Sequence, residues 1–184
     1  MYIRFFAMAI LTMGVLTTHA QDIWFTRTGT ISFHAGTSIE DIDGINNEVA
    51  SFLNVKTGEI AFTVLVKSFH FRRSLMEEHF NENYMESTKF PKSSFSGKIT
   101  DLSKISFSKE GNYKVTVEGD LTIHGEKRKI TVSSTISISG GNISAISGFT
   151  IPMSDYKINI PGVVADKVSK KANVEVKCNY EKKN

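Results

Sequence analysis

Evenly spaced segments in which apolar and polar residues alternate constrain the fold of this chain more than any other feature. In residues 112–123, apolar residues and glycine take every second position from Val115 to Leu121, and polar residues lie between them. Residues 127–139 repeat the alternation. Successive side chains of a strand point to opposite faces, so this pattern predicts antiparallel strands with one buried face and one solvated face.

Short turns divide most of the chain into strands of this kind. Glycine-containing turns lie near Gly58, Gly111, Gly125 and Gly140. Residues 37–47 are mostly polar and are interpreted as a loop or a short helical turn. The predicted strands are residues 24–33 (two short strands or one long strand bent at Gly29), 48–55, 59–71, 93–99, 112–123, 127–139, 142–152 and 172–180. About eight strands joined by short turns predict a single all-β domain, either a meandering antiparallel barrel or a sandwich.

One segment interrupts the β pattern with a helical period. Between Arg72 and Pro91, apolar and aromatic residues recur three and four positions apart, which predicts one amphipathic helix. Glu77 and Glu78 lie largely on its other side, where we expect them to support the first turns and to pair with Arg72 or Arg73. The helical stripe consists of Leu75, Met76, His79, Phe80 and Tyr84.

The first twenty residues have the features of an export signal. Arg4 precedes an uncharged run from Phe5 to Leu16, and Ala20 stands at the position that a signal peptidase reads. We therefore expect residues 1–20 to be a signal peptide and residues 21–184 to be the mature domain, with an uncleaved anchor or a buried first strand as the alternative. The apolar run is too short to span a bilayer comfortably, so the protein is expected not to cross a membrane with it.

Charge and cysteine content exclude several classes of protein. The formal net charge of +3 is too small to indicate a nucleic-acid-binding protein. The single cysteine, Cys178, has no internal disulfide partner, and we interpret it as a small half-buried strand residue. The histidines are not spaced as metal ligands, so neither a metal site nor a catalytic site is predicted.

Several short motifs resemble the YceI-like family. The matching residues are Glu78-His79-Phe80, Lys89-Phe90-Pro91, Phe95, residues 119–125 and Ser154-Asp155-Tyr156. The resemblance implies a periplasmic protein with a lipocalin-like antiparallel barrel of about eight strands and one inserted helix, which binds a lipid or a polyisoprenoid. Lys157 stands where the family usually has glycine, which bears on the backbone bend expected there.

A barrel of this size is either filled by its own side chains or holds one small ligand. By composition, the thirteen phenylalanines favour an ordinary aromatic core, whereas the resemblance favours an apolar cavity. We expect the helical stripe and the facing strand to contact the ligand, with polar groups at the mouth. The candidate binding residues are Phe62, Val64, Val66, Phe69, Phe71, Leu75, Met76, His79, Phe80, Tyr84, Phe95, Phe149 and Tyr156.

The resulting hypothesis is a periplasmic or secreted binding protein for a long apolar ligand, such as a polyisoprenoid, a quinone or a fatty-acid-like lipid. No cofactor is expected beyond such a bound isoprenoid or acyl lipid, and a homodimer is compatible with the sequence. The alternative is an envelope stress factor or protein-interaction module with a filled barrel core. An enzyme that uses His79 or Asp155 as acid or base is disfavoured, because sequence spacing places no pair of groups for such chemistry.

Overall fold

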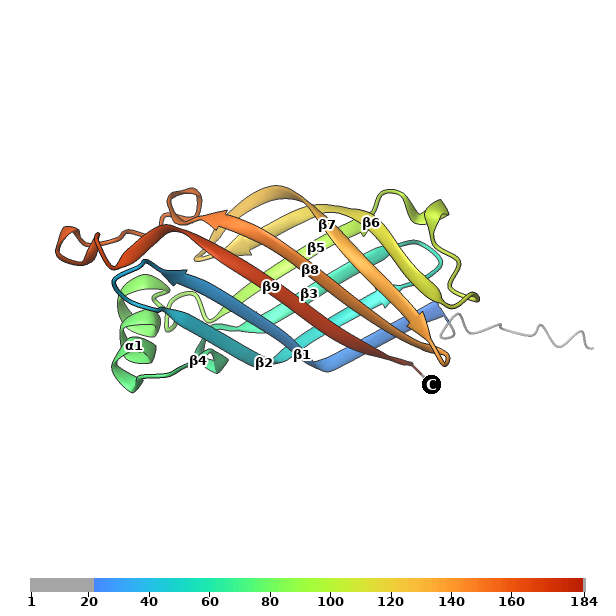
Figure 1. The fold of residues 1–184 in the computed structure, drawn as a ribbon, viewed down its shortest axis with the longest axis horizontal. Helices are drawn as coiled ribbons and strands as arrows, with labels where there is room; N and C mark the ends of the chain where they lie inside the picture. Colours follow the sequence, from blue (N-terminus) through green and yellow to red (C-terminus); the bar gives the residue numbers. More distant parts are fainter. Residues whose placement is uncertain (1–21, 184) are drawn as a thin grey trace, which may run out of the picture.

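The computed structural model describes residues 22–183, which form one closed antiparallel β-barrel (Figure 1). The predicted signal peptide lies outside the described residues. The strands are β1 (Ile23–Gly36), β2 (Asp43–Asn54), β3 (Glu59–Leu65), β4 (His70–Phe71), β5 (Lys92–Ile99), β6 (Gly111–Ile123), β7 (Glu126–Ser139), β8 (Asn142–Pro152) and β9 (Val168–Lys182). The helical elements are η2 (Val66–Ser68), α1 (Ser74–His79), η3 (Phe80–Tyr84), η4 (Leu102–Lys104), η5 (Met153–Tyr156) and η6 (Gly162–Val164).

The strands follow one another around the barrel in chain order. Each pairs antiparallel with its neighbour, and pairing of β1 with both β2 and β9 closes the ring. Eight strands make the wall, and the two-residue β4 adds a short pairing to β2. This closure confirms the meandering barrel and excludes the sandwich, because a sandwich would leave its sheets unjoined at this edge.

The structure extends β1 to Gly36 and begins β9 at Val168, beyond the predicted limits, and it makes two larger corrections. β2 begins at Asp43 rather than at residue 48, because Gly44 and Ile45 pair with β1 on one side and with β4 on the other. The predicted strand over residues 59–71 is divided by η2. The Val66 N–H still donates to the Pro91 carbonyl, but Pro91 has no N–H to donate in return, and the β3–β5 ladder ends there. The predicted bend at Gly29 is confirmed by register shifts on both sides of it.

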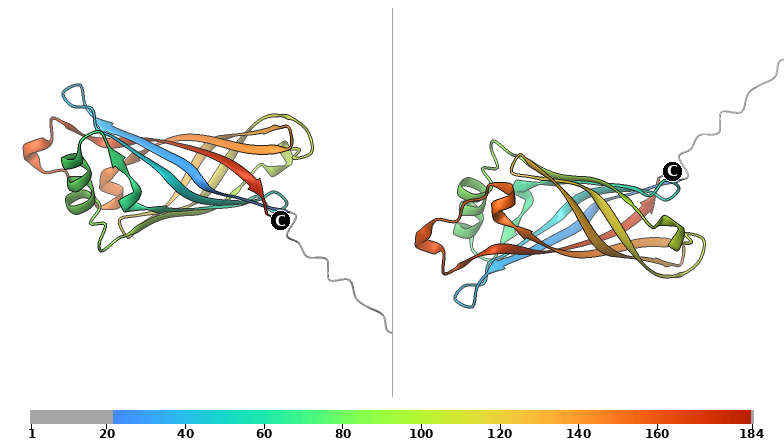
Figure 2. Two further views of the ribbon diagram at one scale, coloured as in Figure 1. Left: turned by 90° about the horizontal axis from the view of Figure 1, so that it is seen from below. Right: turned by 90° about the horizontal axis from the view of Figure 1, so that it is seen from above.

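The helical segment covers one end of the barrel. α1 continues into the π-helical turn η3, and Figures 1 and 2 place both at the end where β1 finishes and β2 begins. The turns η5 and η6 and the β1–β2 loop lie at the same end, which we call the mouth. The C-terminus and the loops after β2, β5 and β7 lie at the opposite end.

The two halves of the barrel interior differ. Near the end opposite the mouth, inward side chains are almost fully buried and pack against one another. They include Leu53, Ile99, Val115, Ile138, Ile143 and Tyr180. Toward the mouth, many inward residues are only partly buried, among them Phe62, Ile130, Val132, Phe149 and Val174. The barrel is therefore filled at one end and hollow toward the other.

Candidate functional site

The hollow half of the barrel contains a cavity of about 510 Å³. Its wall is mainly aliphatic and aromatic, with inward residues from β1, β3 and every strand from β5 to β9. The charged residues of the lining, Glu40, Arg73 and Lys167, come from the loops and helical segment at the mouth. Such a cavity can accept an apolar body from the mouth and leave a polar end near water.

Eleven of the thirteen candidate binding residues line this cavity. They are Phe62, Val64, Phe69, Phe71, Leu75, Met76, His79, Phe80, Tyr84, Phe95 and Phe149. Val66 and Tyr156 lie outside the lining. Val66 is buried in η2, where the chain leaves the β3 ladder, and Tyr156 is buried in η5 against the main core.

Much of the opposite wall of the cavity was not among the predicted binding residues. Phe33, Val174, Val176 and Cys178 also line the cavity. Their alternation in residues 24–33 and 172–180 was a usable signal, because each lies on the apolar face of its strand. The family motifs drew attention to the helix instead, and those two strands are remote from it in the chain.

Four phenylalanines hold the helical segment against the barrel. Phe80 of η3 stacks on Phe33 of β1 at 5.6 Å between ring centroids, and its ring lies 5.5 Å from Phe69 and 5.0 Å from Phe71. We call Phe33, Phe69, Phe71 and Phe80 the aromatic cluster. Because all four also line the cavity, the same contacts fix the helix and form part of the wall.

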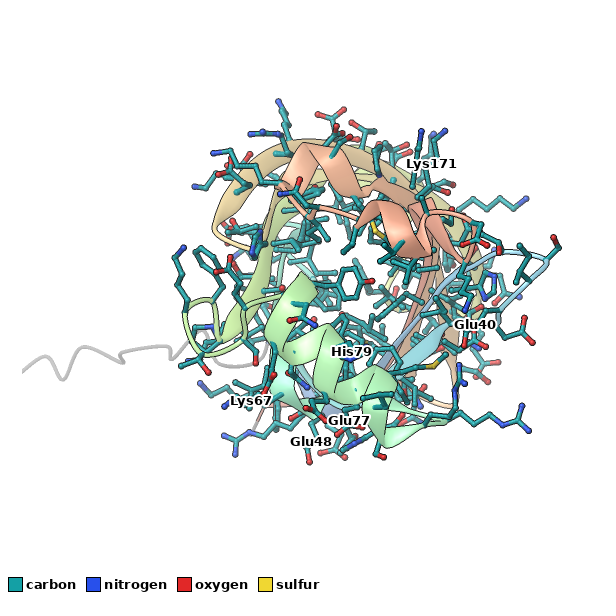
Figure 3. All side chains as sticks on the ribbon, turned by 90° about the vertical axis from the view of Figure 1, so that its left-hand side faces the viewer. Glu40, Glu48, Lys67, Glu77, His79 and Lys171 are labelled. Atoms are coloured by element: carbon teal, nitrogen blue, oxygen red, sulfur yellow. The ribbon has the colours of Figure 1, made fainter. Side chains whose placement is uncertain are left out.

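Polar contacts join three elements around the mouth. The Arg73 guanidinium pairs with Glu40 of the β1–β2 loop, and the Thr37 hydroxyl donates to the Asp166 carbonyl at 2.8 Å. Figure 3 looks at this end and shows His79 on α1 with Glu40 on the neighbouring loop. The predicted pairing of Glu77 with Arg72 or Arg73 is wrong. Glu77 instead accepts from the Phe71 N–H at 3.2 Å and lies 3.4 Å from the His70 ring, because the chain folds back at residues 72–73.

A second set of contacts, centred on His124, ties the helical segment to the other side of the mouth. His124 Nε2 lies 2.8 Å from a Glu86 carboxylate oxygen, and its Nδ1 lies 3.1 Å from the Tyr156 carbonyl oxygen. The ring therefore bridges the Glu86 side chain and the Tyr156 backbone. Glu86, His124 and Lys157 are also the three non-glycine residues with positive φ among residues 22–183. The residues with strained backbone therefore lie at or next to the contacts of His124, which stabilise their conformation.

Replacing His124 by alanine is expected to destabilise the protein by about 2 kcal/mol, because it leaves the Tyr156 carbonyl without this partner and removes the link to the Glu86 carboxylate. The corresponding fall in melting temperature is about 4–8 °C for a domain of this size. The matched control is His34→Ala, which removes an exposed pair with Asp43 at 2.7 Å and should change stability by under about 0.5 kcal/mol. Equal losses in thermal denaturation of the two variants would contradict this account.

Cys178 lies in the cavity wall near its deep end and is 2% exposed. Cys178 is therefore more buried than the half-buried residue we expected. The alternation of a single strand could not show that β1 and β2 enclose its side chain. Burial raises the pKa of the Cys178 thiol to about 11, and the neighbouring Tyr180 hydroxyl opposes this shift. The reactive thiolate is consequently scarce at neutral pH.

Alkylation of Cys178 by iodoacetamide is expected to be about a hundredfold slower than that of free cysteine at pH 8, because both the raised pKa and burial suppress attack. The rate should rise about tenfold per pH unit up to pH 10, since that range lies below the thiol pKa. Mass spectrometry of timed samples measures the rate, and the protein in urea provides the control. Labelling of the folded protein at the rate of free cysteine would contradict the burial.

Within residues 22–183, no group of three or more His, Cys, Asp or Glu side chains is arranged to hold a metal ion. In the same part of the chain, the helices lack the length and apolar character needed to cross a bilayer.

Comparison with protein families gives a match to the YceI-like domain over residues 22–180, which is nearly all of the described chain. The chain belongs to the YceI-like family. None of the curated proteins compared with it matches.

Solved YceI-like structures share the barrel despite low sequence identity. A polyisoprenoid-binding domain from Saccharophagus degradans aligns with a TM-score of 0.76 at 12% identity, covering 88% of this chain and 99% of that one. BcnA from Burkholderia cenocepacia aligns with a TM-score of 0.68 at 15% identity, covering 83% and 96%. The Campylobacter jejuni YCEI protein aligns with a TM-score of 0.50 at 16% identity, covering 98% and 94%. At these identities, the alignments establish the fold alone.

This YceI-like chain keeps the backbone bend after Tyr156 without the glycine that the family resemblance led us to expect there. Lys157 adopts left-handed geometry with φ of 54° and ψ of 27°. Its ammonium lies 2.7 Å from a Glu126 carboxylate oxygen, and its N–H donates to the Ser154 carbonyl at 3.1 Å. These contacts hold a conformation that costs a non-glycine residue about 1 kcal/mol.

Proposed function

We propose that this protein is an exported carrier that shields the apolar tail of one lipid inside the barrel. The observation that carries the proposal is the cavity of about 510 Å³, with an apolar wall and with its charged lining residues at the mouth. Burial of a tail there would stabilise the complex by roughly 25 cal/mol per Å² of apolar surface removed from water. The function proposed is binding without catalysis.

Two further observations support an amphiphilic ligand. Family membership and the structural likeness to a domain described as polyisoprenoid-binding favour a prenyl or acyl tail. Arg73, His79 and Lys167 lie at the mouth end of the lining, where they can contact a polar head group. Residues 1–20 support a periplasmic or secreted location, in which a carrier would protect an insoluble chain from water.

Native mass spectrometry of protein purified from the cells that produce it tests the proposal. We expect a mass increment of one lipid, lost on denaturation and recovered in an organic extract. Protein obtained empty is then incubated with geranylgeraniol, a 20-carbon prenyl alcohol. A protein that is empty when purified and takes up no prenyl alcohol would overturn the carrier function and favour an interaction module. Conversion of the bound lipid to a product would overturn the assignment of binding without catalysis.

A further inference from the structure

The cavity ends at a floor inside the barrel. On β9, inward residues line it from Val168 at the mouth to Cys178. The next inward residue of that strand, Tyr180, lies below the lining and is 2% exposed. Beneath this level begins the packed core, which includes Leu53, Ile99 and Ile143.

A hydrogen bond to another strand of the barrel fixes the Tyr180 side chain. Its hydroxyl is hydrogen-bonded to the Ser51 hydroxyl at 2.9 Å, which links β9 to β2 over the intervening strand β1. Ser51 is itself 6% exposed, so the bond is shielded from water. The phenol is thus fixed at both ends, by its strand and by its hydrogen bond.

The depth above this floor corresponds to a chain of defined length. Val168 and Cys178 are ten residues apart on β9, which is about 33 Å of strand or about 25 Å along the axis of a tilted barrel. An extended hydrocarbon advances roughly 1.25 Å per bond, so that depth holds about 20 carbons. The volume gives a similar answer. A methylene group takes up about as much space as one water molecule in the liquid, about 30 Å³, so a cavity of about 510 Å³ accommodates about 17 carbons.

We propose that Tyr180 sets the chain length of the bound lipid, limiting the buried tail to about 17–20 carbons. The inference rests on the proposed carrier function and specifies its substrate class. A longer chain binds with its extra carbons outside the mouth or folded at the entrance. Those carbons add no affinity, because they are not buried. Tyr180 therefore acts as a specificity-determining residue at the closed end, remote from the helix and the head group.

The dependence of affinity on chain length follows from this geometry. Each methylene that enters the cavity should raise affinity about fourfold, whereas carbons beyond the floor should add nothing. Affinity should therefore rise up to about C18 and then level off. Tyr180→Ala removes about seven non-hydrogen atoms and should move the limit outward by about four to six carbons.

An equimolar mixture of even-numbered fatty alcohols from C10 to C26 tests the inference. Limiting protein is equilibrated with the mixture, excess alcohol is removed, and native mass spectrometry reads the occupancy of each length from its mass. The parent should show a limit near C18, and Tyr180→Ala should extend it by two or three members of the series. Tyr180→Leu, which opens a smaller space, should extend it by one and serves if the alanine variant does not fold.

Two variants control for effects other than floor depth. Tyr180→Phe keeps the ring and removes only the hydroxyl, with its bond to Ser51 and its contact with the Cys178 thiol, so the limit should stay in place. Tyr113→Ala removes a tyrosine of β6 at the same closed end, where its hydroxyl donates to the Lys109 carbonyl at 2.9 Å, and should keep the limit because Tyr113 does not line the cavity. Binding by the parent with no limit up to C26, or an unchanged limit in folded Tyr180→Ala and Tyr180→Leu, overturns the inference and leaves the carrier function standing. Binding of no alcohol by the parent rejects the carrier function itself.

Discussion

Phe80→Glu is expected to reduce bound lipid about tenfold or more while the barrel remains folded. Phe80 is the centre of the aromatic cluster, and its ring also lines the cavity. A carboxylate in this position is next to the apolar tail, and an unpaired charge in an apolar environment costs several kcal/mol. The helical segment also loses its anchor, so the mouth no longer closes over the ligand.

The stability cost should be smaller than the binding cost. Replacing a fully buried phenylalanine by alanine lowers the free energy of unfolding by about 3–5 kcal/mol. Phe80 is only partly buried, so we expect Phe80→Glu to lower it by about 2 kcal/mol. The corresponding fall in melting temperature is about 4–8 °C. Lipid content and melting temperature are measured on one sample of the variant.

The matched control is Phe52→Glu. Phe52 lies on the outer face of β2 and is 42% exposed, so the same chemical change takes place away from the cavity. Bound lipid should then equal that of the parent. Full lipid occupancy in Phe80→Glu, or equal loss in both variants, would show that the aromatic cluster does not retain the ligand.

Gly119→Ala is expected to lower stability by about 3 kcal/mol, at the upper end of the cost of overpacking. Gly119 of β6 pairs with Gly97 of β5, and the Phe95 ring lies over both glycines. A Cβ atom at Gly119 would lie 2.5 Å from the Gly97 Cα, 2.5 Å from the Ser96 carbonyl oxygen and 2.6 Å from the Phe95 ring. Since two of these atoms belong to the backbone, rotation of the phenylalanine alone cannot relieve the clash.

Thermal denaturation should show a fall of about 6–12 °C for Gly119→Ala. The control is Gly148→Ala on β8, where the nearest atom to a new Cβ is the Val174 carbonyl oxygen at 3.8 Å. Alanine in that open strand position should be neutral or stabilising by up to about 1 kcal/mol. If Gly119→Ala were as stable as Gly148→Ala, the close approach of β5 and β6 at Gly97 and Gly119 would be contradicted.

Several features of the fold could be predicted because they are local. Alternation along β6 and β7 identified the inward faces, since period two is a property of any strand. The stripe from Leu75 to Tyr84 identified the one helical segment and the face that meets the cavity. Its length was less predictable, because the segment is only one short helix followed by a π-helical turn.

The candidate site was predicted on one side only. Residues of the helical segment and β3 were found because an aromatic stripe and a family motif mark them in sequence. Phe33 and Cys178 were overlooked, although they lie on inward faces of predicted strands. Tyr156 was placed in the site through its motif, whereas its ring lies in the core and its carbonyl accepts from His124.

By itself, the sequence determined which segments become strands, which face of each turns inward, and that one helical segment lies beside them. Tertiary structure alone decided that the sheet closes between β1 and β9, that the barrel is hollow only toward the mouth, and that Tyr180 is hydrogen-bonded to Ser51 below the cavity. Periodicity depends on neighbours a few positions apart, so the chain displays it directly. The bond between Ser51 and Tyr180 joins residues 129 positions apart, and such contacts exist only once strand order, register and closure have brought them together.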